Sequence, residues 1–167
     1  MENGHKKGFT HESPVNETTE WYTPAWIFEK LGLKFDLDPC HSRQPIKWIP
    51  AAKTFTIDDN GLLQKWTGLV WLNPPYGRMT TSWLKKMHEH RQGVALVFAR
   101  TDCKWYHDYI VKAEAILFLQ GRVAFVNGSG RPGGAGAGCG SILVAWGSES
   151  VKALSKMKDQ GHLVLLK

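Results

Sequence analysis

The chain has 167 residues, of which 43% are hydrophobic and 22% are charged, a balance typical of a folded protein with a buried core. It contains no run of about 18 apolar residues, so no membrane span is expected, and the polar segment 1–20 has no signal-peptide core. A net charge of +6 permits a polyanionic partner without identifying one. We expect a flexible arm over residues 1–19 and a single domain over 20–167.

In the first half of the chain, helical segments alternate with short apolar runs. Thr is a good helix N-cap, Pro suits the first helical position and Gly favours a helix end. A continuous apolar run is typical of a strand that is buried on both faces. The expected elements are a helix from Thr23-Pro24 to Gly32, strands at 35–38 and 69–72 around an irregular stretch at 41–56, a helix at 80–90 and a strand at 93–99.

The second half contains strands that follow one another more closely. The expected elements are a helix at 101–113, strands at 115–119, 123–126 and 141–146, a helix near 150–158 and a last apolar run at 162–166. Alternating strands and helices indicate an α/β fold, with a mixed sheet flanked by helices. We expect the sheet to be parallel in its first half and antiparallel at one edge.

Polar residues stand where two of the expected strands end. Asp38 ends the strand 35–38, and Asn73 follows the strand 69–72. Ligands of open α/β sheets bind at the carboxyl ends of strands. The two residues are therefore expected to belong to one functional site.

Asn73-Pro74-Pro75-Tyr76 is suited to holding a flat ring that carries an amino group. The Asn73 side chain offers a carbonyl acceptor, and the rigid proline backbone can hold the Pro74 carbonyl as a second acceptor. Tyr76 offers a π-face on which a base can stack. The alternative interpretation is a rigid turn at the end of a strand.

Three carboxylates are candidates for ligand binding. Asp36 and Asp38 lie two residues apart at a strand end, so we expect them to point the same way. They could hold an ammonium group, ribose hydroxyls or a metal, or one of them could cap a turn. Asp58 belongs to a strong turn signal, and its binding of a cofactor's adenine amino group is a second interpretation.

The three cysteines are Cys40, Cys103 and Cys139. Their number is odd and they form no Cys-x-x-Cys pair, so neither a disulfide framework nor a metal site is indicated. Reduced thiols fit a cytoplasmic protein. Pro39-Cys40 also matches the nucleophile of cytosine-C5 methyltransferases, which is a rival hypothesis; a buried neutral cysteine is the alternative.

Residues 128–140 form one glycine-rich stretch. It is interpreted either as a flexible surface loop or as a lid over substrate, with Arg131 contacting phosphate. It is not a phosphate-binding loop by pattern, because no Gly-Lys-Ser/Thr follows.

Several motifs, in this order and spacing, resemble those of the phage-type DNA N-6-adenine methyltransferases, which are small Dam-like enzymes. The resemblance covers about residues 18 to 147. The matching segments are Glu20-Trp21-Tyr22-Thr23-Pro24, Phe35-Asp36-Leu37-Asp38-Pro39-Cys40, Gly61-Leu62 with Trp66, Trp71-Leu72-Asn73-Pro74-Pro75-Tyr76-Gly77, Gly121-Arg122-Val123-Ala124-Phe125 and Ser141-Ile142-Leu143-Val144.

The resemblance implies a Rossmann-like methyltransferase fold and S-adenosylmethionine as cofactor. It implies transfer of a methyl group to N6 of an adenine flipped out of double-stranded DNA, in the cytoplasm of a host bacterium. The expected catalytic residues are Asn73, Pro74, Pro75 and Tyr76. The expected cofactor contacts are Trp21, Tyr22, Thr23, Pro24, Asp36, Asp38, Asp58 and Asn73, and the expected DNA contacts are Arg78, Arg122 and Arg131.

Two other functions fit the same residues. One is methylation of another amine, on RNA adenine, cytosine N4 or a protein glutamine. The other is a non-catalytic relic that only binds DNA, an idea motivated by the absence of a glycine-rich turn after the first strand. Sequence specificity is expected from the loops at 41–56, 78–82 and 127–140.

Overall fold

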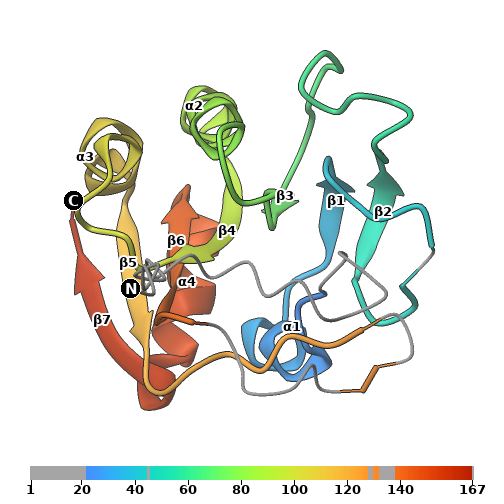
Figure 1. Cartoon of the computed structure of the whole chain (residues 1–167). Helices are drawn as coiled ribbons and strands as arrows, with labels where there is room; N and C mark the ends of the chain where they lie inside the picture. The colour runs from blue at the N-terminus through green and yellow to red at the C-terminus, as the bar shows by residue number, and fades with distance from the viewer. Residues whose placement is uncertain (1–21, 45, 128–129, 132–137, 167) are drawn as a thin grey trace, which may run out of the picture.

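The computed structural model describes residues 22–44, 46–127, 130–131 and 138–166. Within these ranges, seven strands form a single sheet in the order β2-β1-β3-β4-β6-β5-β7 (Figure 1). The strands are β1 (Phe35–Asp38), β2 (Ala51–Thr54), β3 (Val70–Leu72), β4 (Gly93–Phe98), β5 (Ala115–Leu119), β6 (Ser141–Trp146) and β7 (Gly161–Leu165).

The helices cover both faces of this sheet, with α2 and α3 on one side and α1 and α4 on the other (Figure 1). Their bounds are α1 (Ala25–Leu31), α2 (Thr80–His90), α3 (Lys104–Tyr109) and α4 (Ser148–Lys156), with short 3₁₀ helices η1 (Ile110–Lys112) and η2 (Lys158–Gln160). None of the helices in the described ranges is long and apolar enough to cross a membrane.

The predicted mixed sheet is confirmed. The pairs β1–β2, β1–β3 and β3–β4 are parallel, whereas β4–β6, β5–β6 and β5–β7 are antiparallel. The antiparallel β6 lies between β4 and β5, so the first residue of β6 is paired with the last residue of β4: Ser141 with Phe98. Phe98 therefore ends its strand at the edge to which ligands are expected to bind.

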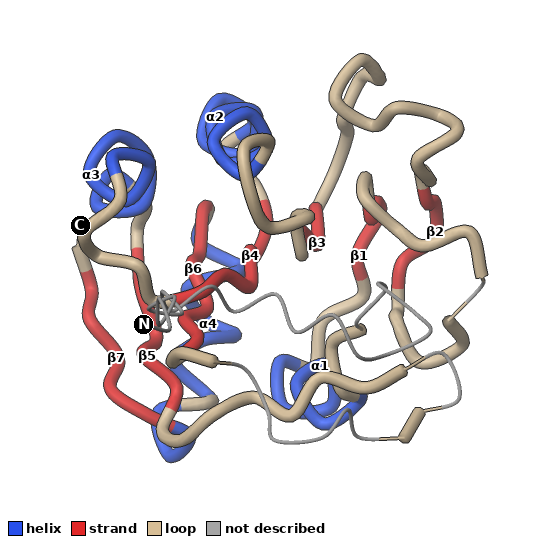
Figure 2. Tube along the Cα trace, in the orientation of Figure 1, coloured by secondary structure: helices blue, strands red, loops and turns tan. Residues whose placement is uncertain are grey.

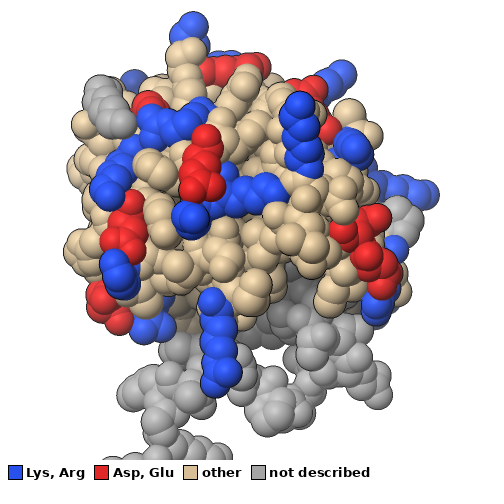
Figure 3. Space-filling view, turned by 90° about the horizontal axis from the view of Figure 1, so that it is seen from above, with Lys and Arg blue, Asp and Glu red and all other residues tan. Residues whose placement is uncertain are grey.

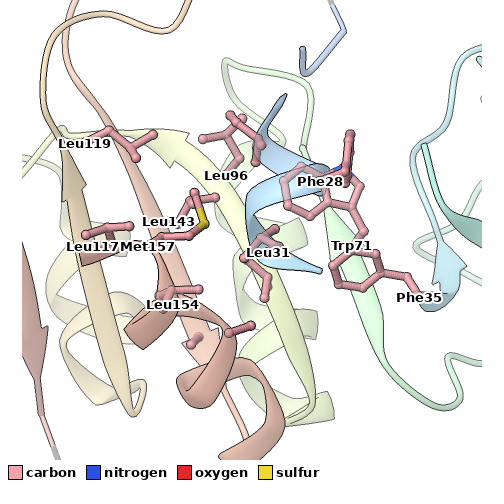
Figure 4. Close-up of a cluster of buried hydrophobic side chains, with 14 of the residues drawn as sticks. Phe28, Leu31, Phe35, Trp71, Leu96, Leu117, Leu119, Leu143, Leu154 and Met157 are labelled. Carbon is pink, nitrogen blue, oxygen red and sulfur yellow. The ribbon is translucent and has the colours of Figure 1, made fainter. Parts of the chain in front are cut away.

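Apolar side chains fill the space on each side of the sheet. Under α1 and α4, the ring of Phe28 meets that of Trp71 at 4.7 Å, and Trp71 meets Phe35 at 5.5 Å (Figure 4). Leu31 and Leu154, from α1 and α4, are fully buried in the same cluster. Because Trp71 lies in β3 and Phe35 in β1, this packing fixes the two strands whose ends carry the candidate site residues.

Three predicted segments differ in the structure. Part of the stretch 41–56, predicted to be irregular, forms the edge strand β2. The predicted strand 123–126 is wrong, because only Val126 pairs, in an isolated bridge with Tyr22. The predicted helix 101–113 contains a shorter α3 followed by η1, because Cys103 has an extended backbone and the chain enters the helix only after it.

The start of α1 also differs by one residue from the prediction. Pro24, rather than Thr23, is the N-cap, and the helix begins at Ala25. The predicted end is confirmed, because Gly32 has a left-handed φ of 61° and donates its N–H to the Phe28 carbonyl.

Candidate functional site

The candidate site lies where β1, β3 and β4 end. Asp38 is the last residue of β1, Asn73 follows β3, and Phe98 is the last residue of β4. Parallel pairing of these three strands brings their carboxyl ends to the same edge of the sheet. Strand β3, which lies between β1 and β4, thus delivers Asn73-Pro74-Pro75-Tyr76 to the place where open α/β sheets bind ligands.

Two side chains hold the backbone of this loop. The Cys40 thiol donates a hydrogen bond to the Asn73 carbonyl at 3.0 Å. The Thr80 hydroxyl donates to the Pro75 carbonyl at 3.1 Å and accepts the Gly77 N–H at 3.0 Å. Gly77 has a φ of 122°, which few other residues adopt. The loop is therefore clamped on both sides of Pro74.

The side-chain oxygen of Asn73 is buried and accepts no hydrogen bond from the described part of the chain. Leaving a buried acceptor unsatisfied costs about 1–3 kcal/mol. Native proteins keep few such groups, and each calls for an explanation. The Asn73 oxygen is thus a free acceptor that the fold holds in place at the strand end.

Tyr76 presents both a covered and an open surface. Its ring stacks on that of Phe98 with centroids 3.8 Å apart and planes inclined by 9°, yet 39% of the residue is exposed. Burial of the hydroxyl end, with Cys139 and Cys40 adding to the effect, raises the pKa of Tyr76 above its usual range. The phenol is therefore neutral, and the ring offers an uncharged π-face.

Asp38 is 3% exposed, and each of its carboxylate oxygens has one partner. One oxygen accepts the Cys40 N–H at 3.2 Å, and the other lies 2.8 Å from Nδ1 of His41. The Ile46 N–H points to Nε2 of His41 at 3.4 Å, which favours the tautomer that carries its proton on Nδ1. A carboxylate has about four lone-pair sites, so Asp38 retains capacity for a ligand.

Asp36 and Asp38 have different surroundings, although they share a strand. Asp36 is exposed and accepts the Leu69 N–H at 2.6 Å, at the point where the chain enters β3. A Cβ on Gly68, which has a φ of 68°, would lie 2.1 Å from the same carboxylate. Asp36 therefore takes part in the turn before β3, a long-range role that the sequence did not predict.

Asp58 lies on the surface and pairs with Arg43 through two hydrogen bonds of 2.9 and 2.7 Å. These bonds hold the pKa of Asp58 below its ordinary value of 3.8. Arg43 in turn lines a cavity of about 330 Å³ next to the Asp38–His41 pair. The cavity lies between the loop after β1 and strand β2, and its lining includes His41, Ser42, Ile46, Lys47, Thr54 and Thr56.

The segment before α1 reaches the same region of the fold. Tyr22 and Val126 exchange two backbone hydrogen bonds, of 2.8 and 3.0 Å, and both pack against Ile46. Thr23 is 1% exposed, and its hydroxyl has no partner among the residues that the structure describes. Pro24 follows as the N-cap of α1. Trp21, predicted with these residues, lies outside the described ranges.

The three predicted DNA contacts are exposed. Arg78 follows the Tyr76 loop, Arg122 follows β5, and Arg131 lies in a turn in which the Asn127 side chain accepts its N–H at 3.0 Å. On the α2 and α3 side of the molecule, Lys and Arg are interleaved with Asp and Glu (Figure 3). That face therefore forms no single basic surface. Residues 128–129 and 132–137 of the glycine-rich stretch lie outside the described ranges.

Cys40 has the environment of a structural thiol. Burial raises its pKa well above the ordinary 9.0, and the neighbouring Asp38 adds to the rise. A nucleophilic cysteine needs a lowered pKa. The thiol instead donates to the Asn73 carbonyl, so the covalent hypothesis has no support from its surroundings. Within the described ranges, no three His, Cys, Asp or Glu side chains are grouped as metal ligands would be.

Sequence reasoning missed three contributors to the site: His41, Thr80 and Phe98. In the sequence, the only indication of a role for His41 was its position three residues after Asp38. Thr80 could have been inferred as a clamp, since it stands three residues after Gly77 at the start of a helix. Phe98 ends a buried strand, but its contact with Tyr76 depends on how β3 and β4 pair.

A mixed sheet with helices on both faces and polar loops at the ends of β1 and β3 is the arrangement of a Rossmann-like methyltransferase. The family model for DNA N-6-adenine-methyltransferase (Dam) matches residues 10–163, and the chain belongs to this family. Membership indicates methylation of DNA adenine at N6. Comparison with curated proteins and with solved structures gave no match.

Proposed function

We propose that this chain transfers a methyl group from S-adenosylmethionine to N6 of an adenine that is flipped out of double-stranded DNA. The observation that carries the proposal is the buried oxygen of Asn73, which has no partner among the described residues, in the same loop as the neutral ring of Tyr76. Flipping a base costs a few kcal/mol of stacking and pairing. Stacking on Tyr76 and hydrogen bonds to the amino group would offset that cost.

The amine is held by oxygens that the fold fixes in advance. The side-chain oxygen of Asn73 accepts one N6–H, and the Pro74 carbonyl accepts the other. The Cys40 and Thr80 bonds engage the carbonyls on either side, those of Asn73 and Pro75. With both N–H groups held, the nitrogen lone pair is localised and directed, so the protein acts mainly through positioning and electrostatics.

The residues present fit the cofactor. Thr23 offers a buried, unpartnered hydroxyl within the described part of the chain, and Asp38 retains lone pairs at the end of β1. We place the adenosine portion in the cavity that His41 and Thr54 line, with Asp58 reached through Arg43. When bound, S-adenosylmethionine supplies an electrophilic methyl group.

DNA contacts are assigned to Arg78, Arg122 and Arg131. Each is exposed on a loop, and the first two follow the carboxyl ends of β3 and β5. Guanidinium groups bind phosphate strongly and hold the duplex without reading its sequence. The arginines would position the duplex while Asn73 and Tyr76 take the base.

In the deciding experiment, the chain is expressed in a bacterium that lacks DNA adenine methylation. The DNA is then sequenced with detection of modified bases. N6-methyladenine at a recurring sequence is expected with the wild type and not with Asn73→Ala. In parallel, DNA, RNA and protein are incubated with labelled cofactor and examined by mass spectrometry. Label on cytosine, RNA or glutamine alone would overturn the proposal, and a lack of cofactor binding in calorimetry would indicate a relic.

A further inference from the structure

Three aromatic rings form a column from the core to the surface of the candidate site. Phe125, which is 8% exposed, meets Phe98 edge to face, with centroids 6.3 Å apart and planes at 88°. Phe98 then stacks face to face on Tyr76 at 3.8 Å. Edge-to-face and stacked pairs are both favoured by the charge distribution of aromatic rings. The outermost ring of the column belongs to the predicted base-binding residue.

Phe98 covers one face of Tyr76 and leaves the other open. Of the residue Tyr76, 39% is exposed, and Phe98 stacks on one face of its ring, so the opposite face is not covered by Phe98. Phe98 itself cannot move freely, because it ends β4, is paired with Ser141 of β6 and packs against the cluster under α1 and α4. The sheet thus fixes the orientation of the Tyr76 ring.

We propose that Phe98 is a positioning residue for the target base, which stacks on the open face of Tyr76 as the next ring of the column. This inference rests on the proposed function. A tyrosine on a surface loop would lose ring mobility each time a base stacked on it. Stacking on Phe98 removes that mobility beforehand, so less of the stacking free energy is lost on binding.

The competing arrangement would insert the base between Tyr76 and Phe98. Stacked layers need about 3.5–4.0 Å each, so the present spacing of 3.8 Å would have to double. The clamps on the Tyr76 loop at Asn73, Pro75 and Gly77 oppose such a movement. The two arrangements differ in what the Phe98 ring contacts: the ring of Tyr76 in the first, and the base itself in the second.

The test uses Phe98→Leu, which removes the ring, and Phe98→Tyr, which keeps it. The substrate is a duplex with the sequence found by modified-base sequencing, carrying either adenine or fluorescent 2-aminopurine at the target position. With Phe98→Leu, we expect kcat/KM for DNA to fall roughly two- to tenfold, the loss of one aromatic pair. The KM for S-adenosylmethionine should stay unchanged, and the 2-aminopurine emission of the complex should differ from that of the wild type, because stacking quenches this base. Phe98→Tyr should restore both readouts.

Phe118→Leu is the matched control, because Phe118 is a half-buried strand residue that packs on the other face of the sheet. It should lower stability without changing either readout. If Phe98→Leu does not fold, Phe98→Met, which also lacks a ring, takes its place in the same measurements. A ringless variant that equals or exceeds the wild type in kcat/KM would overturn the inference. An inactive wild type would instead overturn the proposed function.

Discussion

The ends of β1 and β3 carry buried polar groups that differ in whether the chain supplies their hydrogen-bond partners. Both oxygens of Asp38 have partners from the chain, the Cys40 N–H and the His41 ring. The side-chain oxygen of Asn73 has none among the described residues. A satisfied group contributes to folding, whereas an unsatisfied one costs stability and is explained by a ligand. Substitutions at the two strand ends should therefore affect different properties.

The largest effect is expected from Asn73→Ala. The rate of methyl transfer should fall by about 10²–10³, as when one preorganised hydrogen-bonding group is removed from an active site. Stability should hardly change, because the removed oxygen has no partner to lose in the described part of the chain. Methylation with labelled cofactor and urea unfolding measure the two properties. Near-normal methylation by Asn73→Ala would show that the Asn73 oxygen does not hold the target amine.

Unlike Asn73→Ala, Asp38→Asn should lower stability as well as weaken cofactor binding. An amide cannot accept at both positions, so the Cys40 N–H or His41 loses its partner, and the free energy of unfolding should fall by about 1–3 kcal/mol. Urea unfolding at neutral pH measures the loss. Asp58→Asn serves as the control, because its Arg43 pair is fully exposed and should contribute little. A fully stable Asp38→Asn protein would show that this carboxylate is not part of the scaffold.

An arginine substitution tests whether DNA reaches the β5 end of this edge. Each phosphate contact contributes about −0.9 to the slope of log K against log salt concentration. Arg122→Ala should therefore make the slope of duplex binding shallower by about that amount, with methylation of bound DNA retained. Lys156→Ala, an exposed charge on α4, is the control. Equal slopes for the wild type and Arg122→Ala would exclude a phosphate contact at this position.

The smallest effect concerns Cys40, which connects the two strand ends. Burial raises the pKa of its thiol above the ordinary 9.0. Above pH 9.0 the Cys40 thiol loses its proton in the unfolded chain but keeps it in the folded one. The free energy of unfolding should therefore decline as pH rises above 9.0. In Cys40→Ala this decline should be shallower, as followed by urea unfolding at several pH values. A steeper decline in the variant would contradict this assignment.

Cys40→Ser separates this structural role from covalent catalysis. A serine hydroxyl can still donate to the Asn73 carbonyl, so methylation should persist within a few fold. Complete loss of methyl transfer, in a variant as stable as the wild type, would restore the nucleophile hypothesis.

Strands β3 and β4 could be predicted because each lies in an uninterrupted apolar run, and β1 could be predicted from the alternation of Phe35 and Leu37 with two aspartates. Strand β2 was missed because Ala51–Thr54 lies at the sheet edge, mostly exposed, and lacks such a run. The segment from Val123 to Val126 has the composition of a strand, yet β5 already pairs with β6 and β7. The connection between β2 and β3 forms a long loop without helix or strand (Figure 2).

By itself, the sequence determined that Asn73-Pro74-Pro75-Tyr76 ends a buried strand, because local apolar runs and prolines act over a few residues. Family membership followed from the order of its motifs. Only the tertiary structure decided that the Asn73 oxygen has no partner in the described ranges, that Asp38 pairs with His41, and that Phe98 covers one face of Tyr76. These contacts join residues from different strands and loops, and strand pairing, which local sequence patterns do not specify, sets which of them meet.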